Sequence, residues 1–192
     1  MAETYDDVDL VSDAGVEHLA TAVLLAALTA VLAQASIQLP GGIPFSFQPF
    51  GVFFAGLLLG PLWGGFAIVV YLLAGIAGAP VFSNLGAGAG YLAGPTGGFL
   101  VGFLVGAVVI GGVAHRRLQP RSLSELGAPV AAIALLSGLV PIYAVGIPWF
   151  ASVQGWSIVR AATFLAPFLL GDLIKVAIAV GVVRGGAELR AR

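Results

Sequence analysis

The sequence predicts an all-α fold, an integral membrane bundle of six transmembrane helices. Of its 192 residues, 59% are hydrophobic and only 9% are charged, whereas an ordinary soluble domain is about 25% charged. The mean hydropathy is +1.06. At about 20 apolar residues per spanning helix, the chain has room for about six spans joined by short connections. That leaves no space for a soluble catalytic module.

Two short tails are expected to flank the membrane domain. Residues 1–17 form an acidic N-terminal tail, residues 18–184 contain the spans, and residues 185–192 form a short basic tail. The acidic tail is the opposite of the basic region that begins a secretory signal. The formal net charge of −1 gives no reason to expect nucleic acid as a partner, and the absence of cysteine excludes disulfides and thiolate metal sites.

The first span is expected at about residues 18–39, and it carries alanines at a four-residue pitch, Ala22, Ala26 and Ala30. Small residues at this spacing allow helix backbones to approach closely in lipid. The stripe could pack within the bundle or against another protein. The sequence alone favours packing within the bundle.

A break rich in proline and glycine, residues 40–44, separates this span from an aromatic segment, residues 44–50. We expect the segment to be a non-helical loop at the membrane face, because it mixes aromatic and polar residues, among them Phe47 and Gln48, between two prolines. Its simplest role is that of an interfacial aromatic belt. Its functional role would be that of a lid over a pocket.

Gly60 and Pro61 separate the next two spans, which are expected at about residues 50–59 and 62–78. A proline suits the first turn of a new helix, where its missing N–H costs nothing. The sequence therefore predicts that one helix ends at this point and that another begins.

Residues 80–93 form a glycine-rich loop that could approach a ligand closely. Asn84 and Tyr91 are its polar residues with enough reach to hold a ligand. The glycines form neither GxxxxGK[ST] nor a GxGxxG between a strand and a helix. We therefore expect that this chain does not hydrolyse ATP by itself.

The last three spans are expected at about residues 95–114, 128–146 and 158–183, with an aromatic membrane boundary at residues 147–150. Glycines in and just before the first of these spans fall four apart on one face: Gly94, Gly98, Gly102 and Gly106. Three consecutive GxxxG steps predict a central, closely packed helix.

Asp172 and Lys175 are the only charged residues in the apolar run 161–183. A charge at the bilayer centre costs about 2.5–3.5 kcal/mol on insertion scales, so such residues are rare and usually functional. Three residues apart on a helix, the two side chains can pair, and we expect them to point into the bundle. Pro167 and Gly171 are expected to weaken the helix there. The alternative is a salt bridge that only orders the bundle.

The distribution of arginine predicts that both termini lie in the cytoplasm. Most arginines follow the fourth span or the sixth: Arg116, Arg117, Arg121, Arg184, Arg190 and Arg192. With six spans, both regions lie on the side of the N-terminus, and only Arg160 lies on the other side. Positive residues favour the cytoplasmic side. Asp172 then falls near the bilayer midplane, beneath the loops around Gln48 and Asn84.

Four motifs stand in order along the chain. They are Pro-Phe-[Ser/Thr]-x-Gln at 44–48, Gly-x-x-x-Gly-Pro at 56–61, Gly-Pro-Thr-Gly-Gly-[Phe/Tyr]-x-x-Gly-Phe at 94–103 and Pro-Phe-x-x-Gly-Asp-x-x-Lys at 167–175. Each is ordinary alone, but together they resemble the BioY family, the substrate-binding membrane components of energy-coupling-factor (ECF) biotin transporters. The likeness covers about residues 26–183 and departs at Pro49 and at Leu170, where the family often has proline.

The resemblance implies a six-helix S-component fold in the cell membrane, with residues 18–184 as the substrate-binding domain. It also implies high-affinity biotin binding, with biotin as the transported ligand and no cofactor. Uptake would be driven by a separate transmembrane coupling subunit and two cytoplasmic ATPases. In such proteins alanines on the first helix contact the coupling subunit, which would give Ala22, Ala26 and Ala30 this second role.

Biotin offers a ureido ring with two N–H donors and a carbonyl, an apolar bicycle and a valerate carboxylate. Asp172 could accept a hydrogen bond from the ureido ring, while Lys175 or Asn84 could donate one to its carbonyl. A rival pose puts the carboxylate on Lys175, but our hypothesis is the ureido pose, because the deepest polar pair should meet the part that enters first. Aromatic residues could cover the bicycle. The predicted site is Asp172, Lys175, Asn84, Tyr91, Gln48 and Phe47.

Other functions remain open. A component for thiamine or riboflavin would share the fold, although Lys175 argues against a cationic ligand such as thiamine. A proton-coupled secondary transporter could use Asp172 and Lys175 as a relay, but that class often has broken helices in both halves. An enzyme is disfavoured, because no Ser–His pair, paired carboxylates or His-rich metal spacing lies within the spans.

Overall fold

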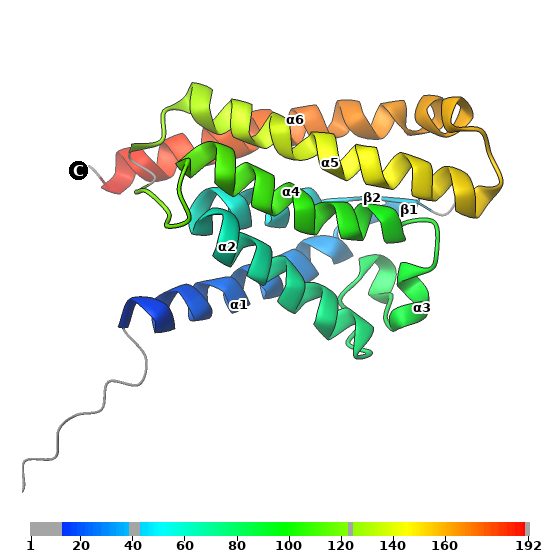
Figure 1. The fold of residues 1–192 in the computed structure, drawn as a ribbon, viewed down its shortest axis with the longest axis horizontal. Helices are drawn as coiled ribbons and strands as arrows, with labels where there is room; N and C mark the ends of the chain where they lie inside the picture. Colours follow the sequence, from blue (N-terminus) through cyan, green and yellow to red (C-terminus); the bar gives the residue numbers. More distant parts are fainter. Residues whose placement is uncertain (1–12, 39–42, 123–124, 191–192) are drawn as a thin grey trace, which may run out of the picture.

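The computed structural model describes residues 13–38, 43–122 and 125–190, which form a bundle of helices (Figure 1). Within these ranges, five helices are long and apolar enough to cross a membrane. They are α1 (Asp13–Gln34), α2 (Gln48–Ile76), α4 (Gly97–His115), α5 (Ala128–Gln154) and α6 (Ile158–Arg190). The short elements are β1 (Ser36–Gln38), β2 (Pro44–Ser46), the 3-10 helix η1 (Ser83–Leu85) and α3 (Ala89–Leu92). The predicted all-helical membrane class is confirmed, but the long helices number five and not six.

Parts of three sequence predictions lie outside the described residues. These parts are residues 1–12 of the acidic tail, residues 39–42 of the break after the first span, and Arg192 among the arginines. The helix α1 begins at Asp13, five residues before the predicted start of the first span at residue 18.

The helix α2 doubles back on itself, which explains the difference in helix count. At Gly60 the backbone leaves the helix, with φ 72° and ψ −171°, a region that only glycine adopts readily. The Nε2 group of Gln48 donates to the Tyr71 hydroxyl at 2.6 Å, although the two residues are 23 positions apart. A straight helix would separate them by about 34 Å. Two helical segments therefore lie side by side where two separate spans were predicted, joined at Gly60 without a loop.

The helix α4 packs between α2 and α5. A side chain at Gly102 or Gly106 would collide with Ile142 of α5, and one at Gly111 would collide with the backbone of α2 at Gly60 and Pro61. Glycine thus allows close approach on two faces of α4. The prediction of a central, closely packed helix is confirmed.

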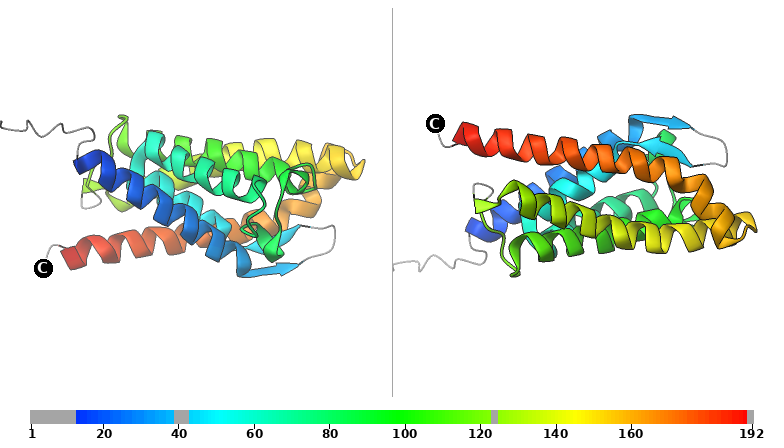
Figure 2. Two further views of the ribbon diagram at one scale, coloured as in Figure 1. Left: turned by 90° about the horizontal axis from the view of Figure 1, so that it is seen from below. Right: turned by 90° about the horizontal axis from the view of Figure 1, so that it is seen from above.

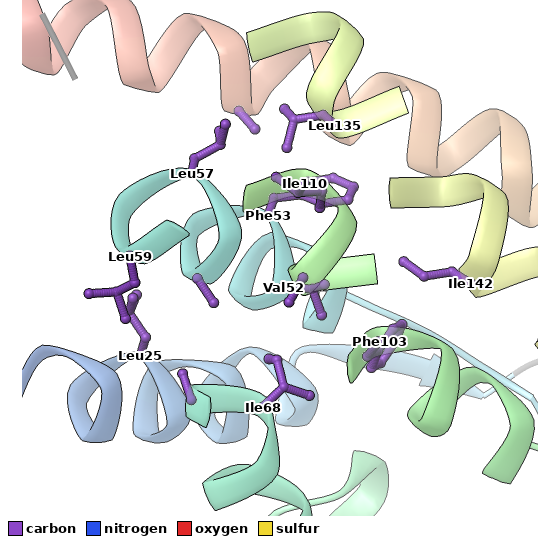
Figure 3. Packing of buried hydrophobic residues seen from close by; sticks show 14 of the residues in the cluster. Leu25, Val52, Phe53, Leu57, Leu59, Ile68, Phe103, Ile110, Leu135 and Ile142 are labelled. Carbon is purple, nitrogen blue, oxygen red and sulfur yellow. The ribbon is translucent and has the colours of Figure 1, made fainter. Parts of the chain in front are cut away.

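The apolar core lies where α2, α4 and α5 meet (Figure 3). Phe53 and Leu57 come from α2, Ile110 from α4 and Leu135 from α5, and all four side chains are fully buried. This core fixes the three helices that, with α6, surround the candidate site.

The alanines of α1 lie on its packed side, and α1 packs mainly on α2. Ala22 and Ala26 are buried in the core, and Ala30 packs against it. This burial supports the first of the two roles considered for the stripe, packing within the bundle. Contact of these alanines with a coupling subunit stays a prediction.

Two helices extend beyond their predicted ends. The helix α5 continues through Pro148 to Gln154, so the predicted aromatic boundary at residues 147–150 lies inside the helix. The helix α6 continues past its predicted end at residue 183 to Arg190, and it passes through Pro167 without a break. Proline is tolerated within transmembrane helices because neighbouring groups satisfy the freed carbonyls. The predicted end of the fifth span at residue 146 is therefore not the end of the helix, and an aromatic membrane boundary at residues 147–150 stays a prediction.

The predicted non-helical loop at residues 44–50 is divided between β2 and the first turn of α2, and β2 pairs antiparallel with β1, which lies where the first span was expected to continue. Ser36 pairs with Ser46, and Ile37 pairs with Phe45. Figure 2 shows the two strands at the end of the bundle where α1 ends. The start of α1 and the end of α6 lie together at the opposite end (Figures 1 and 2).

Candidate functional site

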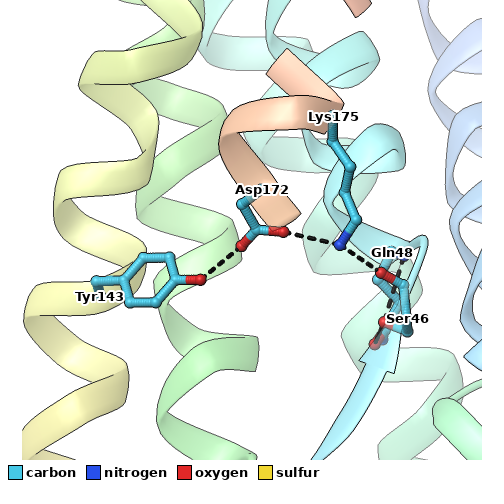
Figure 4. Close-up of polar contacts among 5 residues, drawn as sticks. All are labelled: Ser46, Gln48, Tyr143, Asp172 and Lys175. Carbon is cyan, nitrogen blue, oxygen red and sulfur yellow. Dashed lines mark hydrogen bonds and ion pairs between the residues drawn. The ribbon is translucent and has the colours of Figure 1, made fainter. Parts of the chain in front are cut away.

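Asp172 and Lys175 form an ion pair inside the bundle (Figure 4). Lys175 Nζ lies 2.8 Å from Asp172 Oδ1, and the side chains are only 6% and 9% exposed, respectively. The two residues are three apart on α6, so one helical turn brings both to the same face. An ion pair withdrawn from water in this way is held by further polar contacts.

Two other elements complete those contacts. Tyr143 of α5 donates a hydrogen bond to Asp172 Oδ2 at 2.8 Å. Lys175 Nζ donates to the Ser46 carbonyl oxygen at 2.7 Å and lies 4.2 Å from the centre of the Phe45 ring. Gly171 has no side chain, and this allows the Phe45 ring to lie directly against α6. The pair is therefore tied to β2 on one side and to α5 on the other.

The ion pair lines a pocket with about 570 Å³ of empty space, a volume that includes the opening to solvent. Small-molecule sites commonly have an apolar lining and few polar groups. The apolar wall consists of Ile43, Phe45, Phe99, Leu100, Phe103, Ile142, Leu165 and Phe168. The polar groups belong to Ser46, Gln48, Tyr91, Thr96, Tyr143, Asp172 and Lys175. The pocket can thus hold a small, largely apolar molecule that presents hydrogen-bonding groups to the ion pair.

Gln48 lines the pocket, but other residues of the protein engage its side-chain amide. Its Oε1 atom accepts hydrogen bonds from the hydroxyls of Ser46 and Ser83, both at 2.8 Å. Its Nε2 atom donates to the Tyr71 hydroxyl, which donates in turn to the Val81 carbonyl oxygen at 3.1 Å. Gln48 therefore ties β2, α2 and the loop around η1 together.

Tyr91 of α3 lies at the mouth of the pocket. Its ring stacks on Phe82 with the ring centres 4.9 Å apart, and its hydroxyl donates to the Ser83 carbonyl oxygen at 3.3 Å. Burial raises the pKa of the Tyr91 hydroxyl above its ordinary value of 10.0. The hydroxyl therefore stays protonated at neutral pH and remains a hydrogen-bond donor.

Two of the predicted site residues do not line this pocket. Asn84 lies beside a second, outer cavity, where its Oδ1 atom accepts a hydrogen bond from the Ser36 hydroxyl at 3.3 Å. Phe47 is 45% exposed and packs its ring edge-on against Phe50. Phe45 of β2 takes the place expected for Phe47. Residues two apart on an extended strand share a face, but β2 ends at Ser46, and at Phe47 (φ −90°, ψ 5°) the chain turns into α2. Only Phe45 therefore keeps the orientation of the strand toward the pocket.

Sequence reasoning also missed the roles of Tyr143 and Ser46. Tyr143 carries a hydroxyl within a transmembrane helix, and such a group must find a partner, so it could have been paired with Asp172. Ser46 contacts Lys175 through its backbone carbonyl oxygen. Every residue type has this group, so the sequence could not have indicated the contact.

The fold and the site together define a class: a multi-pass helical membrane protein with a buried pocket for a small ligand, closed on one side by an ion pair. The BioY family model matches residues 4–192. The chain belongs to the BioY family.

Curated relatives agree over most of the chain. The "Probable biotin transporter BioY" of Pyrococcus horikoshii is 36% identical over 157 residues, which are 82% of this chain and 88% of the relative. The "Biotin transporter BioY" of Thermotoga maritima is 38% identical over 157 residues, 81% of this chain and 87% of the relative. The crystal structure of an "S-component for biotin from an ECF-type ABC transporter" matches with a TM-score of 0.81 over 95% of both chains. At 24% identity, this last likeness shows the fold.

Proposed function

We propose that this protein is the biotin-binding S component of an ECF transporter and that it mediates biotin uptake. Relatives that share more than four fifths of the chain bear the name of biotin transporters, which supports transport and not catalysis. The observation that carries the proposal is the buried Asp172–Lys175 pair beside an apolar pocket. A carboxylate acceptor next to an ammonium donor complements the N–H groups and the carbonyl of a ureido ring.

The contacts of the ion pair favour the pose in which the ureido ring lies deepest. Lys175 is already neutralised by Asp172 and also donates to the Ser46 carbonyl oxygen. A ligand carboxylate on Lys175 would bring a second anion next to Asp172 in a buried site, where like charges repel strongly. Tyr91 and Phe45 would cover the bicycle, and Gln48 would hold the wall in shape.

The ECF assembly supplies the energy in this proposal. A transmembrane coupling subunit and two cytoplasmic ATPases assemble with this chain, and Ala22, Ala26 and Ala30 remain candidates for contact with the coupling subunit. In this proposal both segments of α2 cross the membrane, and six crossings leave both termini on the same side. The distribution of arginine favours the cytoplasm as that side. The shared end of α1 and α6 supports this arrangement.

Calorimetric titration of the detergent-solubilised protein with biotin, with thiamine and riboflavin as controls, tests the proposal. We expect tight one-to-one binding of biotin alone, weakened at least about a hundredfold by Lys175→Ala or Asp172→Asn. Thermal unfolding of both variants provides the control. A variant that no longer folds would make the pair structural and the site assignment wrong, and a response to another vitamin alone would refute the choice of biotin.

A further inference from the structure

A second cavity adjoins the candidate pocket. Pro44, Tyr91 and Thr96 line both spaces, so these three residues form the boundary between them. The outer cavity has about 1000 Å³ of empty space, part of it open solvent. A ligand that fills the inner pocket can therefore extend past Tyr91 without leaving the protein surface.

The two spaces differ in polarity and burial. The inner pocket has mostly buried walls and contains the Asp172–Lys175 pair. The outer cavity is lined by half-buried and exposed residues, apart from the buried Ser83, and it presents the hydroxyl or amide groups of Ser83, Asn84 and Thr96. No charged residue in the described part of the chain lines this outer cavity.

This difference determines where each end of a biotin molecule lies. The neutral ureido ring can enter the buried site and exchange hydrogen bonds with the ion pair, whereas a carboxylate loses far more hydration free energy on burial. The valerate carboxylate therefore points past Tyr91 into the outer cavity and keeps its water. The outer cavity provides no lysine or arginine in its described lining to pair with that carboxylate.

We infer that the outer cavity is a binding site for groups attached to the carboxyl end of biotin. The protein then binds biotin amides with a small polar substituent, such as biotin linked to the side-chain amine of lysine. Conversion of the carboxylate to an amide removes no ion pair, and the substituent occupies space that is already open. The inference rests on the proposed function, because it assumes that biotin occupies the inner pocket.

Gly90 provides a direct probe of the outer cavity. It lines that cavity and not the inner pocket, and a Cβ atom added there would meet no protein atom within 4 Å. We therefore expect a leucine at this exposed position to occupy space in the outer cavity and to leave the fold intact. Its neighbour Ala89 is exposed and lines neither space, so Ala89→Leu is the matched control.

The test measures the dissociation constants of biotin and of Nε-biotinyl-lysine with the full chain in detergent. We expect the two ligands to bind wild type within about fivefold of each other, and Gly90→Leu to weaken only biotinyl-lysine, by at least about tenfold. Ala89→Leu should change neither constant.

Two results would overturn the inference while leaving biotin binding intact. One is biotinyl-lysine bound by wild type more than about a hundredfold more weakly than biotin; the other is an equal effect of Gly90→Leu on both ligands. Folded protein that does not bind biotin at all would refute the proposed function itself. The failure of each proposal is thus distinguishable.

Discussion

Tyr143 fixes the orientation of the Asp172 carboxylate. Its hydroxyl donates to Oδ2 at 2.8 Å, while Lys175 donates to Oδ1 at 2.8 Å. Because each carboxylate oxygen accepts one hydrogen bond, the carboxylate cannot rotate freely. The lone pairs that are left on the two oxygens therefore point in fixed directions. A carboxylate held in this way is ready for a ligand N–H before the ligand arrives, which lowers the ordering cost of binding.

Tyr143→Phe removes this hydroxyl and keeps the ring. We expect biotin binding to weaken roughly ten- to a hundredfold, because a hydrogen bond to a charged group contributes about 1.5–3 kcal/mol. Ser137→Ala on the same helix is the control, since its hydroxyl bonds only the Ala134 carbonyl oxygen. Equal affinity of Tyr143→Phe and wild type in calorimetry would show that Lys175 alone positions the carboxylate.

Some site residues could be predicted from the sequence because of where their charge lies. Asp172 and Lys175 stand in an apolar run, and the cost of charge in lipid requires them to find partners. Phe45 could not be separated from Phe47 in this way, since both are aromatic residues of one short segment. The two rings are separated by the end of β2 at Ser46, which leaves Phe45 in the strand and against α6 and puts Phe47 in the turn into α2.

At the scale of the elements, the turn of α2 frees a backbone carbonyl. In a regular helix the Leu57 carbonyl oxygen would accept from residue 61, but Pro61 has no N–H. The buried side chain of His115 takes over, with Nε2 3.0 Å from that oxygen. His115 Nδ1 accepts from the Arg121 backbone N–H at 2.9 Å, so the ring proton lies on Nε2 and points at Leu57. The end of α4 thus stabilises the break in α2.

His115→Leu leaves the Leu57 carbonyl oxygen without a partner. A buried unsatisfied group costs about 1–3 kcal/mol, so we expect a lower unfolding temperature in detergent with little change in biotin affinity. The matched variant is His18→Leu, because His18 is only half-buried and stacks on Trp63 at 5.7 Å. Equal unfolding temperatures for wild type and His115→Leu would contradict the capping role.

Gly60→Ala tests the turn itself. Alanine at φ 72° and ψ −171° is strained by about 1–3 kcal/mol, so the free energy of unfolding should fall by that amount. Gly112 of α4 has open space around it, and Gly112→Ala should leave stability unchanged or raise it by about 0.5–1 kcal/mol. Chemical denaturation in detergent measures both variants. A stable Gly60→Ala protein would show that the turn does not require glycine.

Element positions followed from hydropathy, but element ends did not. The apolar runs placed every long helix, because composition alone decides which segments suit lipid. The fifth span is predicted to end at Gly146, yet α5 continues through Pro148 to Gln154. Gly60 and Pro61 do form a break, but the sequence gives no measure of whether the chain turns back within one residue or through a loop.

For the whole molecule, the two ends of the bundle differ in arginine content, because Arg116, Arg117, Arg121, Arg184 and Arg190 lie toward one end and Arg160 toward the other. The chain contains no cysteine, so labelling of a single introduced cysteine measures the accessibility of that one position. We expect Ser157→Cys, between α5 and α6, to react with a membrane-impermeant maleimide in intact cells. Ser122→Cys, between α4 and α5, should react only after permeabilisation, because the proposed topology puts the arginine-rich end in the cytoplasm. The reverse labelling pattern would invert the proposed topology.

The contact between Ser46 and Lys175 joins residues 129 positions apart. A ribosome that adds about 5–20 residues per second needs roughly 6 to 26 s to make the chain between them. During that interval β2 has no lysine to bind, and the pocket lacks one wall. In the proposed site, biotin cannot assist the early steps of membrane insertion, and it can stabilise the newly made protein only after α6 has docked. A ribosome that stalls before Asp172 therefore leaves a membrane-embedded chain that lacks the proposed biotin site.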